Sequence, residues 1–152
     1  MKTNLDDTFW MQQALQRAEL ALQHNEVPVG AIVVHDDKII GEGWDQTVTA
    51  KDPTAHAEII ALRAAGKTLQ NYRLLDATLY VTLEPCSMCA GALVNARIKR
   101  VVFALADSKS GACGSVFNII DAPCLNHRLY STQGILAEES LALLQSFFKA
   151  RR

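Results

Sequence analysis

Apolar side chains near the start of the chain recur at a spacing of three and four residues. They are Met11, Ala14, Leu15, Ala18 and Leu22. This spacing predicts an amphipathic helix with one buried face. Asp6, Asp7 or Thr8 is placed to cap its first turn. A helix of this kind needs a sheet against which to bury its apolar face.

Two segments rich in β-branched side chains follow and predict a β-hairpin. Its strands are expected over residues 30–35 and 38–44, with the turn at Asp36-Asp37. After a polar loop, the apolar run over residues 56–65 predicts a second helix that ends near Gly66. The first half of the chain therefore predicts the order helix, strand, strand, helix.

The second half of the chain alternates apolar runs with turn-forming residues. It predicts a buried strand, a helix whose first turn contains Pro85, another strand, a loop, a last strand and a final helix. These cover residues 77–83, 86–96, 100–104, 107–114, 128–132 and 135–149 in turn. Elements in this order predict one three-layer α/β/α domain over residues 1–152, built on a mixed sheet of five strands with helices on both faces.

Composition agrees with a compact folded domain. Apolar residues make up 49% of the 152 residues and charged residues 20%, which is ordinary for such a domain. No apolar run has the length of a membrane span, and the stretch from Met1 to Trp10 contains two aspartates and no apolar signal-peptide core. The four cysteines therefore predict a reducing compartment, the cytoplasm, without membrane association.

Charge gives no global sign of a nucleic-acid partner. The net charge is −1, whereas proteins that bind phosphates usually carry a basic face. Basic residues are clustered locally, at Arg97, Lys99 and Arg100 and again in the last residues from Phe147 to Arg152. Such clusters indicate either a local contact with phosphates or a helix end whose charge complements the helix dipole.

Two short motifs carry candidate chemistry: His56-Ala57-Glu58 and Pro85-Cys86-Ser87-Met88-Cys89. One imidazole and two thiolates suit zinc, and three protein ligands leave a tetrahedral ion one position for water. Zinc lowers the pKa of bound water to about 7. Glu58 follows His56 by two residues, so it lies near that water without being needed as a ligand. The motifs predict a hydrolytic zinc site with Glu58 as proton carrier.

Each motif alone has a simpler interpretation. An isolated CxxC is often a redox pair or half of a structural zinc site, and His-x-Glu is usually a helix start with a surface carboxylate. The conjunction favours catalysis, because His56 and the cysteine pair each follow a loop proline and each open an apolar helix. Two helix amino termini that meet at one metal favour thiolate and hydroxide through their dipoles.

Together the motifs form the H-x-E…P-C-x-x-C pattern typical of zinc-dependent nucleobase deaminases. Beyond them the chain resembles the bacterial tRNA-specific adenosine deaminases, which convert the wobble adenosine of an anticodon to inosine. Deaminases of small bases share the metal motifs but not the later segments. The resemblance covers nearly the whole chain and includes residues 26–31, 52–58, 71–83, 107–111, 126–128, 134–137 and 147–149.

The resemblance implies a cytidine-deaminase-like fold and a homodimer with one Zn²⁺ per subunit. It also implies a tRNA anticodon stem-loop as partner, with the target adenine flipped into the site. His56, Cys86 and Cys89 then hold zinc, and Glu58 shuttles protons while water replaces the amino group at C6. The resemblance places substrate contacts at Asp45, Ala57, Asp107, Lys109, Ser110, Arg128, Phe148, Arg151 and Arg152.

Asp45 departs from the pattern of these deaminases, in which an asparagine usually follows the residue matching Trp44 and contacts the base. An ionised carboxylate accepts hydrogen bonds and donates none, so either Asp45 contacts the ribose or the change is neutral. Two other functions stay open. One is deamination of a free purine or pyrimidine; the other is a non-catalytic RNA-binding module in which Cys113 or Cys124 is the fourth zinc ligand.

Overall fold

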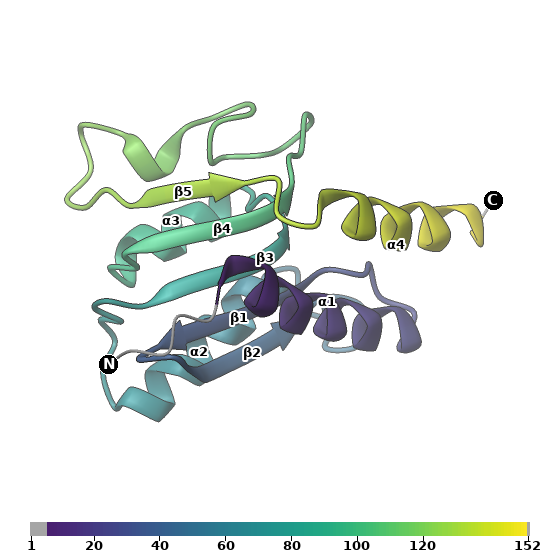
Figure 1. Cartoon of the computed structure of the whole chain (residues 1–152), viewed down its shortest axis with the longest axis horizontal. Coiled ribbons are helices and arrows are strands. Elements are labelled where there is room, and N and C mark those ends of the chain that lie inside the picture. Colours follow the sequence, from purple (N-terminus) through teal and green to yellow (C-terminus); the bar gives the residue numbers. More distant parts are fainter. Residues whose placement is uncertain (1–5, 152) are drawn as a thin grey trace.

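A mixed sheet of five strands forms the centre of the computed structural model, which describes residues 6–151 (Figure 1). The strand order is β2-β1-β3-β4-β5. The predicted five-stranded mixed sheet with helices on both faces is therefore confirmed. The elements are α1 (Asp7–Gln23), β1 (Gly30–His35), β2 (Lys38–Trp44), α2 (Ala57–Leu69), β3 (Thr78–Leu83), α3 (Ser87–Asn95), β4 (Arg100–Leu105), the short 3-10 helix η1 (Ile119–Asp121), β5 (Tyr130–Gln133) and α4 (Ala137–Lys149).

The direction of strand pairing changes within the sheet. β1 pairs antiparallel with β2 and β3, whereas β3, β4 and β5 run parallel. The hairpin has the predicted bounds, and Asp36 and Asp37 in its turn have φ angles of 51° and 56°, which match the twist of the strands they join. Because β3 and β4 are parallel, the segments that follow them begin at the same edge of the sheet.

Helices cover both faces of the sheet (Figure 1). α1 packs on one face against Ile32, Tyr80 and Val102, and α4 contacts α1 and extends beyond the carboxyl ends of the strands. α2 and α3 cover the other face, over Val81 and Phe103. Within residues 6–151, the helices lack the combination of length and apolar character that crossing a membrane requires.

Glycines in β2 allow α2 to lie directly on the sheet. A Cβ atom at Gly43 would lie 2.4 Å from the backbone oxygen of Ala57, and one at Gly41 would lie 2.3 Å from that of Ala61. Only glycine permits these approaches, because any larger residue would push the helix away. The contact at Gly43 fixes the first turn of α2, which carries Glu58.

The second helix is longer than predicted. It continues through Gly66 to Leu69 and ends at Gln70, whose left-handed backbone has a φ angle of 55°. The hydroxyl of Thr68 donates a hydrogen bond to the backbone oxygen of Ile40 over 2.7 Å. A glycine within a helix is about 1 kcal/mol less favourable than an alanine. Packing of this last turn on β2 thus outweighs the cost of Gly66.

Other predicted positions shift by a few residues. Pro85 precedes Cys86, the N-cap residue of α3, and does not lie in the first helical turn. The last strand begins at Tyr130, later than expected, because the preceding loop continues further. Leu15 and Leu22 are only partly buried. The buried face of α1 comprises Trp10, Met11, Ala14, Ala18 and Ala21.

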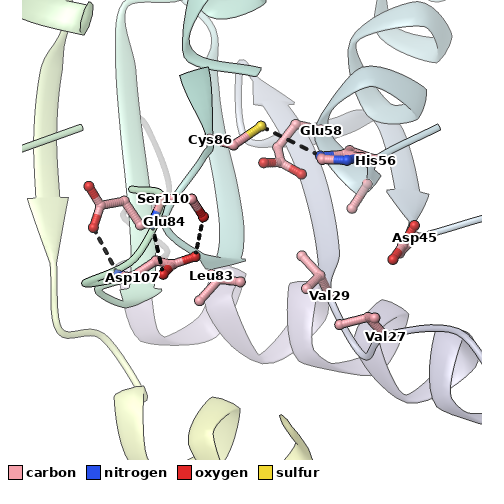
Figure 2. Close-up of a pocket in the computed structure, with 11 residues that line it drawn as sticks. Val27, Val29, Asp45, His56, Glu58, Leu83, Glu84, Cys86, Asp107 and Ser110 are labelled. Carbon is pink, nitrogen blue, oxygen red and sulfur yellow. Dashed lines mark hydrogen bonds between the residues drawn. The ribbon is translucent and has the colours of Figure 1, made fainter. Parts of the chain in front are cut away.

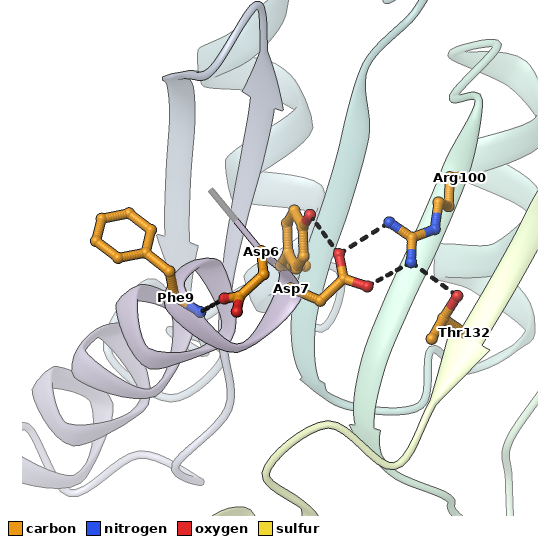
Figure 3. A network of polar contacts seen from close by, with 6 residues as sticks. Asp6, Asp7, Phe9, Arg100 and Thr132 are labelled. Carbon is orange, nitrogen blue, oxygen red and sulfur yellow. Dashed lines mark hydrogen bonds and ion pairs between the residues drawn. The ribbon is translucent and has the colours of Figure 1, made fainter. Parts of the chain in front are cut away.

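A polar network ties the first turn of α1 to the sheet (Figure 3). Asp6 caps the helix by accepting a hydrogen bond from the backbone N of Phe9 over 2.9 Å. Asp7 forms a bidentate pair with Arg100 at 2.9 and 2.5 Å, and the hydroxyl of Tyr80 donates to it over 2.8 Å. Hydrogen bonding from Arg100 holds the pKa of Asp7 below its ordinary value, although partial burial acts in the opposite direction.

We expect Asp7→Asn to lower the free energy of unfolding at neutral pH by about 1–2 kcal/mol, between the values for exposed ion pairs and for hydrogen bonds to charged groups. Because folding lowers the pKa of Asp7 from 3.8, its contribution is complete above that value and is lost as the pH falls through the folded pKa. Urea unfolding of both proteins at neutral and strongly acidic pH measures this loss.

The matched control is Asp6→Asn, which removes a neighbouring charge but keeps an effective N-cap. It should change the free energy of unfolding less than Asp7→Asn at neutral pH. A deficit for Asp7→Asn that is equally large in strong acid would contradict the role of the ion pair.

Candidate active site

The two predicted motifs meet at the carboxyl end of β3, where α2 and α3 both begin (Figure 2). His56 is the N-cap residue of α2, Cys86 is that of α3, and Cys89 lies in the first turn of α3. β3 leads into Cys86, and contact with β2 fixes the start of α2. The sheet thereby brings together side chains that are 30 and 33 residues apart in the sequence.

The side chains of His56, Cys86 and Cys89 have the spacing of a tetrahedral zinc site. His56 Nδ1 lies 3.7 Å from Cys86 Sγ and 3.5 Å from Cys89 Sγ. Zinc bonds of about 2.0–2.1 Å to nitrogen and about 2.3 Å to sulfur, at tetrahedral angles, give an N–S separation of about 3.6 Å. The donor set therefore fits Zn²⁺. In the part of the chain that the structure describes, the group contains these three side chains and no fourth.

Ionisable groups at this cluster have shifted pKa values. A hydrogen bond from Cys89 lowers the pKa of Cys86 to about 4, and the same bond raises the pKa of Cys89. One thiolate is therefore available without a strong base. Burial raises the pKa of Glu58 to about 7, and this residue is 4% exposed. A carboxyl group of this kind can both accept and release a proton near neutral pH.

A cavity of about 160 Å³ lies beside the cluster. Figure 2 shows Glu58 next to His56 and Cys86, with Asp45 on one side and Asp107 on the other. Sites for drug-sized ligands have volumes of about 300–1,000 Å³. This cavity is smaller, and its size suits a single nucleobase. The lining consists of Val27, Val29, Asp45, His56, Ala57, Glu58, Leu83, Glu84, Cys86, Asp107 and Ser110.

Asp45, which the resemblance places in contact with the substrate, lines this cavity. Its Oδ1 accepts a hydrogen bond from the backbone N of Thr47 over 3.1 Å, and its own backbone N donates to the oxygen of Val29 over 3.1 Å. These bonds hold the side chain in an Asx turn. The carboxylate is therefore held in one orientation, in which it can contact a ligand in the cavity.

An adjoining groove of about 840 Å³ runs between α4 and the loop after β4. It shares Val27, Leu83 and Asp107 with the cavity, so the two spaces lie next to one another. Lys109 and the exposed ring of Phe148 line this groove and do not line the cavity. The structure thus places both predicted contacts next to the cavity.

The predicted RNA contacts Arg128 and Arg151 line neither the cavity nor the groove. Arg128 precedes β5 at the amino ends of the parallel strands, whereas the cavity lies at their carboxyl ends, so one chain does not bring the two together. The guanidinium of Arg151 lies 3.6 Å from the ring centroid of Phe147 and donates to the backbone oxygen of Asn25 over 3.0 Å. Arg152 lies outside the described residues.

Sequence reasoning missed two buried carboxylates that hold the loops on either side of the cavity. Glu26 accepts hydrogen bonds from the backbone N atoms of Val48 and Thr49 over 3.2 and 2.7 Å. Glu84 binds backbone N–H groups of the loop over residues 107–115. Glu84 directly follows the strand predicted over residues 77–83, but no sequence pattern indicates that either acid binds backbone N–H groups.

Comparison with known proteins identifies the family. Residues 5–152 match the MafB19-like deaminases. The tRNA-specific adenosine deaminase of Haemophilus influenzae is 54% identical over 96% of this chain and 85% of its own length; that of Buchnera aphidicola is 46% identical over 100% and 99%. A structure from a study of A-to-I editing by tRNA:A34 deaminases at the wobble position of transfer RNA has a TM-score of 0.87 at 40% identity, covering 90% of this chain and 99% of that one. The chain belongs to the family of tRNA-specific adenosine deaminases.

Proposed function

We propose that this chain hydrolyses the wobble adenosine of a tRNA anticodon stem-loop to inosine, in the cytoplasm. The observation that carries the proposal is a cluster of three metal ligands beside buried Glu58, at a cavity that suits one base. A structural zinc site has four protein ligands and needs no such carboxylate. The names of the bacterial relatives support adenosine in tRNA as the substrate.

In this proposal His56, Cys86 and Cys89 hold one Zn²⁺ per chain. When bound, zinc supplies a Lewis acid that lowers the pKa of a water molecule to about 7. Two thiolates balance the charge of the ion, so the site is close to neutral. The amino ends of α2 and α3 point at the cluster and add partial positive charge that favours anionic ligands.

Glu58 moves the protons in the proposed reaction. As the water oxygen bonds to C6 of adenine, Glu58 accepts a proton from that water and delivers it to N1. It then accepts the remaining proton from the new hydroxyl at C6 and transfers it to the amino nitrogen, so that the C6–N bond breaks, ammonia leaves and the C6 carbonyl of inosine forms. The buried position of Glu58 at the cavity keeps bulk water from competing for these protons.

The groove beside α4 is the proposed path for the neighbouring nucleotides. Because it adjoins the cavity, we expect a base flipped into the cavity to leave its neighbours in the groove. Phe148 offers a ring on which a base can stack, and Lys109 and Lys149 offer positive charge to phosphates. These contacts suit an unpaired loop, whose bases can be splayed out of a stack.

The proposal includes a homodimer. The outer face of α2 and α3 has an apolar depression of about 460 Å³, lined by residues that include Ile59, Leu62, Ala92 and the exposed Tyr72. Exposed apolar surface of this kind marks protein contacts, and a second copy is the proposed occupant. Sedimentation of the RNA-free protein over a range of concentrations tests this; a monomer throughout would contradict a dimer that forms without RNA.

Single-turnover assays on a transcribed anticodon stem-loop test the proposed function. We expect the wobble adenosine to become inosine, and a matched stem-loop with guanosine at that position to stay unchanged. Free adenosine, guanine and cytidine should react far more slowly, because they lose the contacts in the groove. A preference for a free base would establish a small-molecule deaminase, and turnover of none would support a non-catalytic RNA-binding module.

We expect Asp45→Asn to keep adenosine as the substrate and to change kcat/KM by less than about tenfold, equivalent to about 1.4 kcal/mol. An asparagine oxygen can accept the same bond from the backbone N of Thr47. Because N7 of adenine is an acceptor, the Asp45 carboxylate is expected to serve a ribose hydroxyl instead. Stem-loops with ribose or deoxyribose at the wobble position measure this preference in both proteins. A wild-type preference for free guanine that the substitution reverses would contradict it.

A further inference from the structure

Glu84 is a buried carboxylate for which the proposed reaction has no use. It follows β3 directly, two residues before Cys86, and is 3% exposed. The loop over residues 107–115 follows β4 at the same edge of the sheet, and its Asp107 and Ser110 line the cavity. Glu84 therefore lies between the segment that carries a metal ligand and the loop that forms one wall of the cavity.

Four donors from this loop converge on the two oxygens of Glu84. Oε1 accepts hydrogen bonds from the backbone N of Asp107 over 3.0 Å and from the hydroxyl of Ser115. Oε2 accepts from the backbone N atoms of Cys113 over 3.0 Å and Ser115 over 3.1 Å. The two oxygens of a carboxylate have about four acceptor positions, and four donors of the loop bind them.

The loop also packs directly against the carboxylate. A Cβ atom at Gly111 would lie 2.4 Å from Cδ of Glu84, so no side chain fits between the loop and the acid. Two backbone bonds extend the contact: Ala112 N donates to the oxygen of Pro85 over 2.8 Å, and Glu84 N donates to that of Leu105 over 2.8 Å. The loop is thus attached to the short segment that leads into Cys86.

We propose that Glu84 is a positioning residue that sets the Asp107–Ser110 wall of the cavity relative to the metal-ligand cluster. Asp107 transmits the effect, because its backbone N binds Glu84 while its Oδ1 accepts from the backbone N atoms of Lys109 and Ser110 over 3.0 and 3.3 Å. The effect of this wall on the substrate rests on the proposed function, whereas attachment of the loop by Glu84 can be measured without turnover.

Glu84→Gln tests the proposal, because an amide nitrogen presents donors to a loop that itself presents donors. In the zinc-loaded protein, the peptide over residues 106–116 should exchange its amide hydrogens at least about tenfold faster. Zinc content should stay at that of the wild type. KM for the stem-loop should rise at least about tenfold while kcat falls less than about threefold, because the wall holds the substrate and Glu58 performs the proton transfers.

Gly111→Ala reaches the same contact from the loop side, since its Cβ displaces the carboxylate, and should give the same pattern. If Glu84→Gln does not fold, this variant and the milder Ser115→Ala decide the question. The matched control is Glu26→Gln, which removes a second buried acid. It should speed exchange at residues 46–51 and leave residues 106–116 unchanged.

Unchanged exchange at residues 106–116 in folded, zinc-loaded Glu84→Gln or Gly111→Ala would overturn the proposal. Faster exchange with an unchanged KM would overturn the role in substrate positioning. A wild-type protein that turns over no stem-loop, but whose loop is released by these substitutions, would contradict the proposed function and leave the attachment of the loop by Glu84 established.

Discussion

Glu58→Gln should lower the single-turnover rate on the stem-loop by about 10⁴-fold while zinc content and fold stay unchanged. The amide keeps the shape of the side chain but cannot carry a proton. General acid–base catalysis typically contributes about 10²–10⁴-fold, and a group that serves two successive transfers belongs at the upper end. Glu58 is buried at the cavity wall, so a water molecule does not readily replace its carboxylate.

With enzyme in saturating excess over the stem-loop, the single-turnover rate reports the chemical step alone. The affinity of Glu58→Gln for RNA should equal that of the wild type. The control is Glu19→Gln, which removes a carboxylate from the exposed side of α1 and should react at the wild-type rate. A Glu58→Gln protein that kept more than about a tenth of the wild-type rate would rule out Glu58 as the proton carrier.

Loss of the metal should lower activity by at least about 10³-fold, because a Lewis acid supplies several kcal/mol of transition-state stabilisation. Cys89→Ala should lose zinc and activity together, since Cys89 Sγ lies 3.5 Å from His56 Nδ1 within the ligand group. Cys124→Ala should keep both, because Cys124 is an exposed free thiol. Zinc per chain is measured by elemental analysis, and re-addition of zinc after chelation should restore the wild-type rate.

Cys113→Ala is the sharper control, because Cys113 is buried in the loop held by Glu84. In the described part of the chain, Cys113 does not belong to the group of ligand atoms that His56, Cys86 and Cys89 form. The substitution should leave one zinc per chain. Loss of zinc from Cys113→Ala would instead indicate a closed site with four protein ligands, and the non-catalytic interpretation would then be favoured.

Elements are predictable from the sequence where several local rules agree. The strands over residues 30–35 and 38–44 have their predicted bounds because β-branched side chains and the Asp36-Asp37 turn point to the same register. The prediction that the second helix ends near Gly66 is wrong. Glycine disfavours a helix by only about 1 kcal/mol, and the hydrogen bond from Thr68 to β2 favours continuing it. Where one residue decides locally, packing can overrule it.

Within the site, the cluster of His56, Cys86 and Cys89 is predictable from the sequence and the loop anchors are not. The local pattern predicts that one helix begins at His56 and another at Cys86, with Cys89 in its first turn. The sheet then brings the starts of the two helices together. Glu84 binds backbone groups 23 to 31 residues away, and backbone N–H groups carry no sequence signature. The distance of Arg128 from the cavity emerges only from the parallel register of β5.

The two helices that carry the candidate metal ligands begin without a stabilising side-chain cap. His56 and Cys86 occupy the N-cap positions, and neither side chain forms a capping hydrogen bond. Serine, threonine, aspartate or asparagine at such a position typically contributes about 0.5–2 kcal/mol. In the zinc-free protein, one of these residues in place of His56 or Cys86 should therefore raise the free energy of unfolding. In the zinc-loaded protein the same substitution should lower it, because the binding free energy of the metal exceeds the contribution of a cap. Bound zinc thus takes the place of the missing caps at the start of both helices.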